Sequence, residues 1–177
     1  NRRRWPALLV QSFWETADKS GDFHQRFPAD TSFAQTQTVV MLTYDQQFIY
    51  LAAICKDPIK GKFVTQSMKR DFNYFGTDYF AVNIDPFSDR TNGFHFAVTP
   101  YGAQREGLIT NGGNGRESVK ISWDNKWFSK VAHYDGYYVI EMAIPFKTLR
   151  FQEGSTKWRI NFIRNDYKRP ERTNWAW

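Results

Sequence analysis

The chain has 177 residues, a length that suits one ordinary domain and allows a sizeable buried core. Aromatic residues make up 18% of it, which favours β-strands, and its single cysteine excludes an internal disulfide. The net charge of +6 is scattered along the chain, and no apolar run approaches membrane-spanning length. We therefore predict one domain over residues 1–177, with neither a clustered nucleic-acid-binding surface nor a transmembrane segment.

The first 33 residues are irregular and rich in turn-forming residues. The chain begins at Asn1 rather than Met and shows no signal peptide, which suggests a processed protein or a fragment of a larger one. Compact basic runs occur only at 2–4 and, near the other end, at Lys168, Arg169 and Arg172. Because basic runs at chain ends are usually hydrated, we expect both to be solvated tails.

Two β-like runs follow, at 38–44 (TVVMLTY) and 48–55 (FIYLAAIC), around a turn at 45–47. They predict a hairpin. Cys55 ends the second run among apolar residues, so we expect it to be a small buried hydrophobic residue rather than a nucleophile.

The segment 78–100 (DYFAVNIDPFSDRTNGFHFAVTP) holds two apolar runs joined by turn-forming residues, which predicts a second hairpin with a long connection. Oxygens of Asp85, Asp89 and Asn92 in that connection could surround a calcium ion, which takes 6–8 oxygen ligands. The alternative is turn chemistry, in which these side chains bond their own backbone. His95 alternates with Phe94 and Phe96, so we expect it to be solvent-facing or hydrogen-bonded rather than a metal ligand.

The remaining chain predicts a mobile loop at 102–115, a hairpin of 127–133 and 137–144 around Asp135-Gly136, and a last strand at 158–167. The inward face of that last strand stays open. Many short strands with almost no helical periodicity predict an all-β fold, an antiparallel sandwich or barrel.

An ordered series of segments resembles the family 9 carbohydrate-binding module superfamily over nearly the whole chain. The segments are FWETA, TYDQQFIYLAAICKD, GTDYFAVNIDPFSDRTNGFHFAVTPYGAQ, WDNKWFSKV, DGYYVIEMAIPFKTLRF and WRINFIRND. The resemblance implies an antiparallel β-sandwich of jelly-roll type with short helical turns, often with bound calcium. It also implies a non-catalytic module that binds oligo- or polysaccharide.

The variant that this chain resembles stands at the front of larger exported bacterial proteins, often before a predicted outer-membrane β-barrel. The resemblance therefore implies an exported protein that is periplasmic, outer-membrane-associated or extracellular, with a role in carbohydrate recognition or catabolism.

In sugar-binding members of the superfamily, two tryptophans hold a sugar ring between their faces while polar side chains bind its hydroxyl groups. The matching places here hold aromatic and polar residues, which the resemblance makes candidate site residues. The ring faces would come from Tyr74, Phe75, Trp175 and Trp177, and the hydroxyl contacts from Arg164, Asn165 and Asp166. Ala81 and Ala97 stand where a carboxylate and an arginine are expected, so two polar contacts are missing.

Three other functions are weighed against sugar binding. One is an interaction or scaffold domain that keeps the sandwich and has lost the sugar site, as Ala81 and Ala97 suggest. Another is glycoside hydrolysis, which needs two paired carboxyl groups. The third is single-stranded nucleic-acid binding, which needs basic residues around exposed aromatics. Four carboxyl groups could be proposed for hydrolysis, but no motif pairs them: Asp78, Glu106, Asp124 and Glu141.

Overall fold

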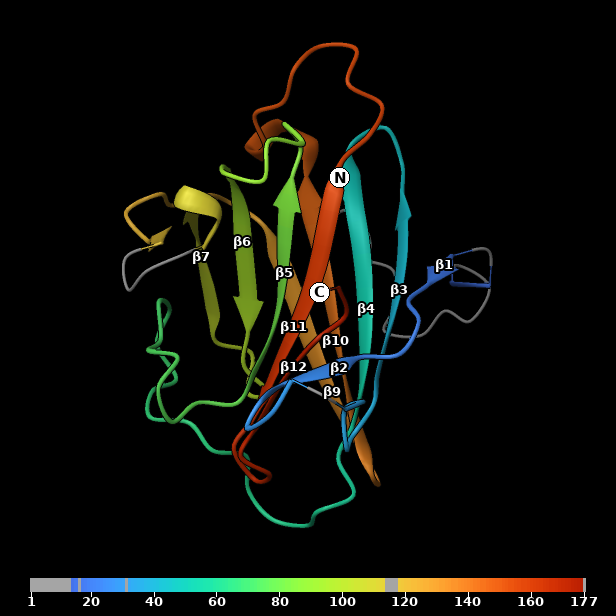
Figure 1. Cartoon of the computed structure of the whole chain (residues 1–177), viewed down its shortest axis with the longest axis vertical. Helices are drawn as coiled ribbons and strands as arrows, with labels where there is room; N and C mark the ends of the chain where they lie inside the picture. The colour runs from blue at the N-terminus through green and yellow to red at the C-terminus, as the bar shows by residue number, and fades with distance from the viewer. Residues whose placement is uncertain (1–13, 16, 31, 114–117, 177) are drawn as a thin grey trace, which may run out of the picture.

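The structure, a computed structural model, describes residues 14, 15, 17–30, 32–113 and 118–176 (Figure 1). In this part of the chain, two antiparallel sheets pack face to face, which confirms the predicted sandwich. We name each sheet after a central strand. In spatial order, the β4 sheet consists of β1 (Asp18–Lys19), β3 (Thr38–Tyr44), β4 (Phe48–Lys56), β10 (Tyr137–Pro145) and β9 (Phe128–Tyr134). The β5 sheet consists of β2 (His24–Phe27), β12 (Glu171–Asn174), β11 (Arg159–Asp166), β5 (Tyr79–Asp85), β6 (Gly93–Val98), β7 (Gln104–Ile109) and β8 (Val119–Lys120).

The core lies between the two sheets, where alternate residues of each strand point inward. Phe80 and Val82 of β5 pack in one cluster with Ile140 and Met142 of β10, and all four are at most 1% exposed. Cys55 is fully buried in the same cluster, as predicted. Burial raises the pKa of its thiol, so it stays uncharged.

The predicted hairpins are confirmed. β3 pairs with β4, β5 with β6, and β9 with β10, each antiparallel. The last strand also forms, as β11, and pairs with β5 in the middle of its sheet (Figure 1). Its inward face is now defined, because Ile160 and Phe162 belong to the core while Ile163 packs in a separate cluster on the outer side. Two short 3-10 turns are present: η2 (Phe146–Thr148) agrees with the expected short helical turns, and η1 (Asn111–Gly113) lies within the predicted loop at 102–115.

The predicted loop at 102–115 is wrong in its first half, because residues 104–109 form β7. The sequence QREGLI has little intrinsic strand preference, so pairing with β6 on one side and β8 on the other decides its conformation. Gly107 is required by this arrangement, since a Cβ atom there would lie 2.8 Å from the carbonyl oxygen of Lys120.

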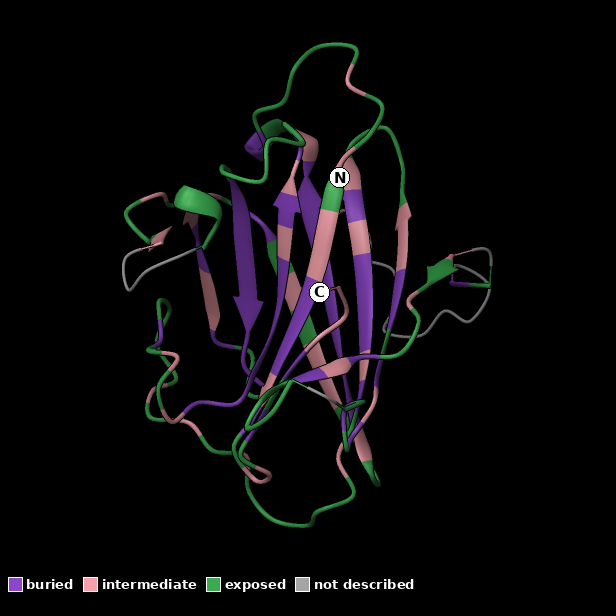
Figure 2. Cartoon of the chain, in the orientation of Figure 1, coloured by how far each residue is buried: buried purple, intermediate pink, exposed green. Residues whose placement is uncertain are grey.

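The outer face of the β5 sheet is partly covered by the segment that precedes β5. Phe72 and Tyr74 of this segment pack with the outward residues Ala81, Ala97 and Ile163. As a result β6 is buried along its whole length, on both faces (Figure 2). The two alanines therefore leave room for aromatic rings where larger polar side chains would otherwise stand.

Candidate functional site

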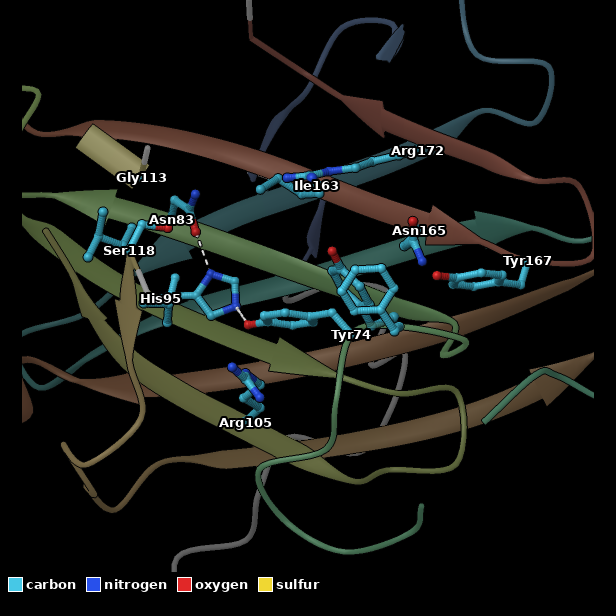
Figure 3. A pocket seen from close by; sticks show the side chains of 14 residues that line it. Tyr74, Asn83, His95, Arg105, Gly113, Ser118, Ile163, Asn165, Tyr167 and Arg172 are labelled. Atoms are coloured by element: carbon cyan, nitrogen blue, oxygen red, sulfur yellow. Dashed lines mark hydrogen bonds between the residues drawn. The ribbon is translucent and has the colours of Figure 1, made fainter. Parts of the chain in front are cut away.

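A pocket of about 410 Å³ lies on this outer face of the β5 sheet (Figure 3). Because side chains alternate along a strand, residues 79 and 83 of β5, 95 of β6, 105 of β7, and 163 and 165 of β11 all point to this side. The loop before β5, the end of β7 with its turn, and the segment after β11 form the walls. The lining side chains used below are Tyr74, Phe75, Asn83, His95, Arg105, Asn165, Tyr167 and Arg172.

A buried hydrogen-bonded chain of Tyr74, His95 and Asn83 forms one side of the pocket (Figure 3). The Nδ1 atom of His95 lies 2.6 Å from Oδ1 of Asn83. Since that amide oxygen can only accept, Nδ1–H donates and Nε2 accepts from the Tyr74 hydroxyl. Burial, aided by the charges of Arg105 and Arg172, lowers the pKa of His95 to about 3. His95 is thus a neutral, hydrogen-bonded histidine, which is one of the two environments expected for it.

Arg105 fixes the Tyr74 ring from the β7 side. Its guanidinium carbon lies 4.1 Å from the ring centroid, and its Nη1 donates to the carbonyl oxygen of Phe72 at 2.6 Å. Burial raises the pKa of the Tyr74 hydroxyl, so it remains a neutral donor to His95. The position of Tyr74 is therefore set by its contacts with His95 and Arg105.

Tyr74 and Phe75 both line the pocket, where the sequence placed them. They differ in exposure. Tyr74 is half-buried, whereas Phe75 is 78% exposed and keeps most of its ring free. The Asn73 side chain holds the turn by accepting from the Phe75 backbone N–H at 3.0 Å. Phe75 is thus the ring with a face available to a ligand.

Asn165 lines the pocket as predicted, and its amide donates to the carbonyl oxygen of Thr77 at 3.1 Å. The neighbouring Tyr167 also lines the pocket, which the sequence reasoning missed. Asp78 positions it. One carboxylate oxygen of Asp78 accepts from the Tyr167 backbone N–H at 2.6 Å and the other from that of Val64 at 2.7 Å. The sequence held a signal for Tyr167 as a site residue, because it directly follows the polar pair Asn165-Asp166.

Arg164 and Asp166 lie outside the pocket, which corrects the predicted polar set. Because Asn165 points outward, its two neighbours point to the opposite side of the sheet. There the Arg164 guanidinium donates to Asp166 at 3.1 Å and to the carbonyl oxygen of Lys56 at 2.7 Å. Arg164 also lies over the Tyr138 ring, 5.6 Å from its centroid. Arg164 therefore joins the two sheets, and Asp166 holds its guanidinium.

Trp175 does not join Phe75 in this pocket, contrary to the predicted pair of rings. Its backbone N–H donates to the carbonyl oxygen of Phe162 at 3.0 Å, and its ring packs on the Phe162 ring with centroids 5.3 Å apart. It lines a neighbouring hollow of about 680 Å³ that also borders Asn83. Trp177 lies outside the described residues.

The basic run at 168–172 is not a solvated tail. Lys168 donates to Asp57 at 2.7 Å and lies 4.2 Å from the centroid of the Phe63 ring. Arg172 belongs to β12 and lines the pocket. Sequence reasoning missed both roles because the pairing of residues 171–174 with β11 is visible only in the folded sheet.

No family model and no curated protein matches the chain. Two solved structures of a family 9 carbohydrate-binding module from Caldicellulosiruptor kristjanssonii do, one in complex with cellotriose and one with glucose. Both are 15% identical to this chain, with TM-scores of 0.60 and 0.61, over 92% and 94% of this chain and 74% and 78% of theirs. A candidate carbohydrate-binding protein from Bacteroides uniformis matches with 11% identity and a TM-score of 0.62, over 87% of this chain and 76% of its own. The chain has the fold of a family 9 carbohydrate-binding module.

The connection between β5 and β6 is the loop for which the sequence predicted a calcium site. Asp85 accepts backbone N–H bonds from Phe87 and Arg90, and Asp89 accepts those of Thr91 and Asn92. Hydrogen bonds to the Asn92 backbone and side chain lower the pKa of Asp89. Among the described residues, no group of three or more His, Cys, Asp or Glu side chains is placed to hold a metal ion. This arrangement is the turn chemistry given as the alternative, and a calcium site in this loop stays a prediction.

Among the carboxyl groups considered for hydrolysis, Glu106 and Asp124 come together, because both accept from Nη2 of Arg70. Glu106 is buried and accepts from Arg70 and from the indole N–H of Trp127, and Asp78 binds backbone N–H groups. Glu141 is buried on β10 of the other sheet. Among the described residues that line the pocket, none is Asp or Glu. In the same part of the chain, no helix has the length and apolar character needed to cross a membrane.

Proposed function

We propose that this chain is a non-catalytic carbohydrate-binding module whose ligand occupies the pocket on the outer face of the β5 sheet. The observation that carries the proposal is that the exposed Phe75 ring and the amide of Asn165 line the same pocket. The apolar face of a sugar ring packs well on an aromatic side chain, while a few polar groups bind its hydroxyl groups and orient it. Tyr167 adds a second, partly exposed ring.

The comparisons support this assignment through the fold, since two of the similar structures hold cellotriose and glucose. We extend the proposal to the setting that the sequence resemblance implies. The module would belong to a larger exported bacterial protein, periplasmic, outer-membrane-associated or extracellular, that recognises or degrades carbohydrate. Any hydrolase activity would then reside in another domain.

Isothermal titration with a panel of neutral and charged mono- and oligosaccharides, including cellotriose and glucose, tests the proposal. We expect Phe75→Ala and Asn165→Ala each to weaken binding about tenfold, which corresponds to about 1.4 kcal/mol. Tyr134→Ala removes a partly exposed ring from the β9–β10 turn of the other sheet and serves as the matched control. Binding that is equally strong in Phe75→Ala and in the control would exclude this pocket as the sugar site.

A scaffold domain without sugar binding is the second candidate, and two observations favour it. Trp175 packs on Phe162 instead of facing Phe75, and the places of two expected polar contacts, Ala81 and Ala97, lie in the cluster formed with Phe72. The same titration separates the two functions. A folded protein, judged by circular dichroism, that gives no heat with any sugar of the panel would establish the scaffold role.

A further inference from the structure

Two arginines flank the pocket, and the described residues provide no carboxylate that neutralises either of them. Arg105 stands on β7 and Arg172 on β12, with β6, β5 and β11 between these strands. In Figure 3 they lie on opposite sides of the Tyr74–His95 pair, and Arg172 is the strand partner of Asn165. Arg70, Arg164 and Lys168 form ion pairs with carboxylates, and none of these three lines the pocket.

The two guanidinium groups are free to different degrees. Arg105 is anchored, because it stacks on Tyr74 and donates to the carbonyl oxygen of Phe72, yet its Nε is buried without a partner among the described residues. Arg172 is exposed, and no hydrogen bond or ion pair within the described chain involves its guanidinium. Its five N–H donors are therefore available to a ligand.

The positive charges of Arg105 and Arg172 act on groups inside the pocket. Both arginines lower the pKa of His95 beyond the effect of burial, and both favour the ionised form of the Tyr74 hydroxyl against burial. Because His95 stays neutral and none of the described residues that line the pocket is acidic, these residues do not compensate the two charges. A partly enclosed site lined by one sign of charge concentrates ligands of the opposite sign.

We infer that the pocket selects a saccharide that carries an anionic group, a carboxylate or a sulfate. This inference rests on the proposed sugar-binding function and names its ligand class. The planar guanidinium of Arg172 binds two oxygens of the anionic group through two parallel N–H bonds, the geometry that arginine offers to carboxylates and to tetrahedral oxyanions. The sugar ring packs on Phe75, and Arg105 adds a fixed positive charge from the opposite wall.

A polynucleotide fits these observations less well. Single-stranded nucleic acid needs a positively charged groove that follows the backbone over several nucleotides, with rings spaced along it. Here the two charges face one pocket of about 410 Å³. An oligonucleotide is therefore included in the test as a competing ligand.

The test is isothermal titration at low salt with matched ligands: glucose against glucuronate and glucose 6-sulfate, and galactose against galacturonate and galactose 6-sulfate. Inorganic sulfate and a ten-nucleotide single-stranded DNA complete the set. We expect at least one anionic sugar to bind about tenfold more tightly than its neutral partner. That preference should shrink at about 0.5 M salt, where exposed charges are screened. The uronate and sulfate arms show which anionic group is recognised.

Arg172→Gln should abolish the preference, and Arg172→Lys should retain only part of it because it loses the paired N–H bonds. Arg150→Gln removes an exposed arginine from outside the pocket and is the charge-matched control. Equal binding of neutral and anionic sugars would overturn the inference and leave the sugar-binding function intact. No binding of any sugar would overturn both, and tighter binding of the DNA than of every sugar would point to nucleic acid instead.

Discussion

His95 connects the pocket to the sheet beneath it. Its ring is 4% exposed and bridges Asn83 of its own sheet to Tyr74 of the covering loop. A buried polar group of this kind is stable only when its hydrogen bonds are made, and protonation would place an uncompensated charge between Arg105 and Arg172. The neutral state of one residue therefore maintains the wall of the pocket.

This state gives a pH-dependent stability with a defined sign. The pKa of His95 is about 3 in the folded protein and about 6.5 in an unfolded chain, so between these values the unfolded chain binds the additional proton. Stability from this residue is therefore complete above pH 6.5 and falls as the pH drops toward 3, by up to about 1.4 kcal/mol per pH unit.

Urea unfolding of the wild type and of His95→Gln at pH 7, 6, 5 and 4 measures this effect. We expect the stability difference between the two proteins to shrink steadily as the pH falls. His24→Gln replaces a partly exposed histidine of β2 and is the control. A stability difference that stays constant from pH 7 to pH 4 would show that His95 takes up its proton equally in both states.

At the scale of elements, Asp78 joins segments that are far apart in the chain. It precedes β5, and its carboxylate accepts one backbone N–H from the 57–78 connection and another from the end of β11. Burial raises the pKa of this carboxyl group even though both N–H bonds favour its charged form. Burying the Asp78 carboxylate costs free energy, and the buried group positions Tyr167 beside the pocket.

Asp78→Ala leaves the N–H groups of Val64 and Tyr167 without this acceptor. An unpaired buried polar group costs about 1–3 kcal/mol, so we expect the free energy of unfolding to fall by about 2–4 kcal/mol in chemical denaturation. Asp22→Ala, at an exposed aspartate, should change it by less than about 0.5 kcal/mol. A loss in Asp78→Ala no larger than in the control would remove Asp78 from its joining role.

At the scale of the whole molecule, stability comes from the layer between the sheets. Phe80 of β5 is fully buried, and its ring stacks on that of Phe162 in β11 with centroids 6.2 Å apart. Phe80→Ala should lower the free energy of unfolding by about 3–5 kcal/mol, because it removes buried apolar area and leaves a cavity. Thermal and urea denaturation measure this, with Tyr134→Ala as the exposed-ring control. A loss below about 1 kcal/mol would mean that the core relaxes around the missing ring.

The sequence alone determined the main strands, their hairpins and the sandwich, because period-two alternation and turn residues are local signals. It also placed Tyr74, Phe75 and Asn165 at the pocket through the family resemblance. β7 and β12 could not be predicted, since QREGLI and ERTN become strands only by pairing with β6 and β11. The side of the sheet to which the Arg164 and Asp166 side chains point could not be predicted either, because it depends on which face of β11 meets the core.

Only the tertiary structure decided which side chains share the pocket. Arg105 and Arg172 are 67 positions apart in the chain, by their numbers, and face one site because the sheet order places β7 and β12 on either side of β6, β5 and β11. The turn of Trp175 onto Phe162 was decided in the same way, by packing against the core. Local patterns define strands and faces, whereas the charge and the rings of the pocket arise from contacts between strands that are distant in the chain.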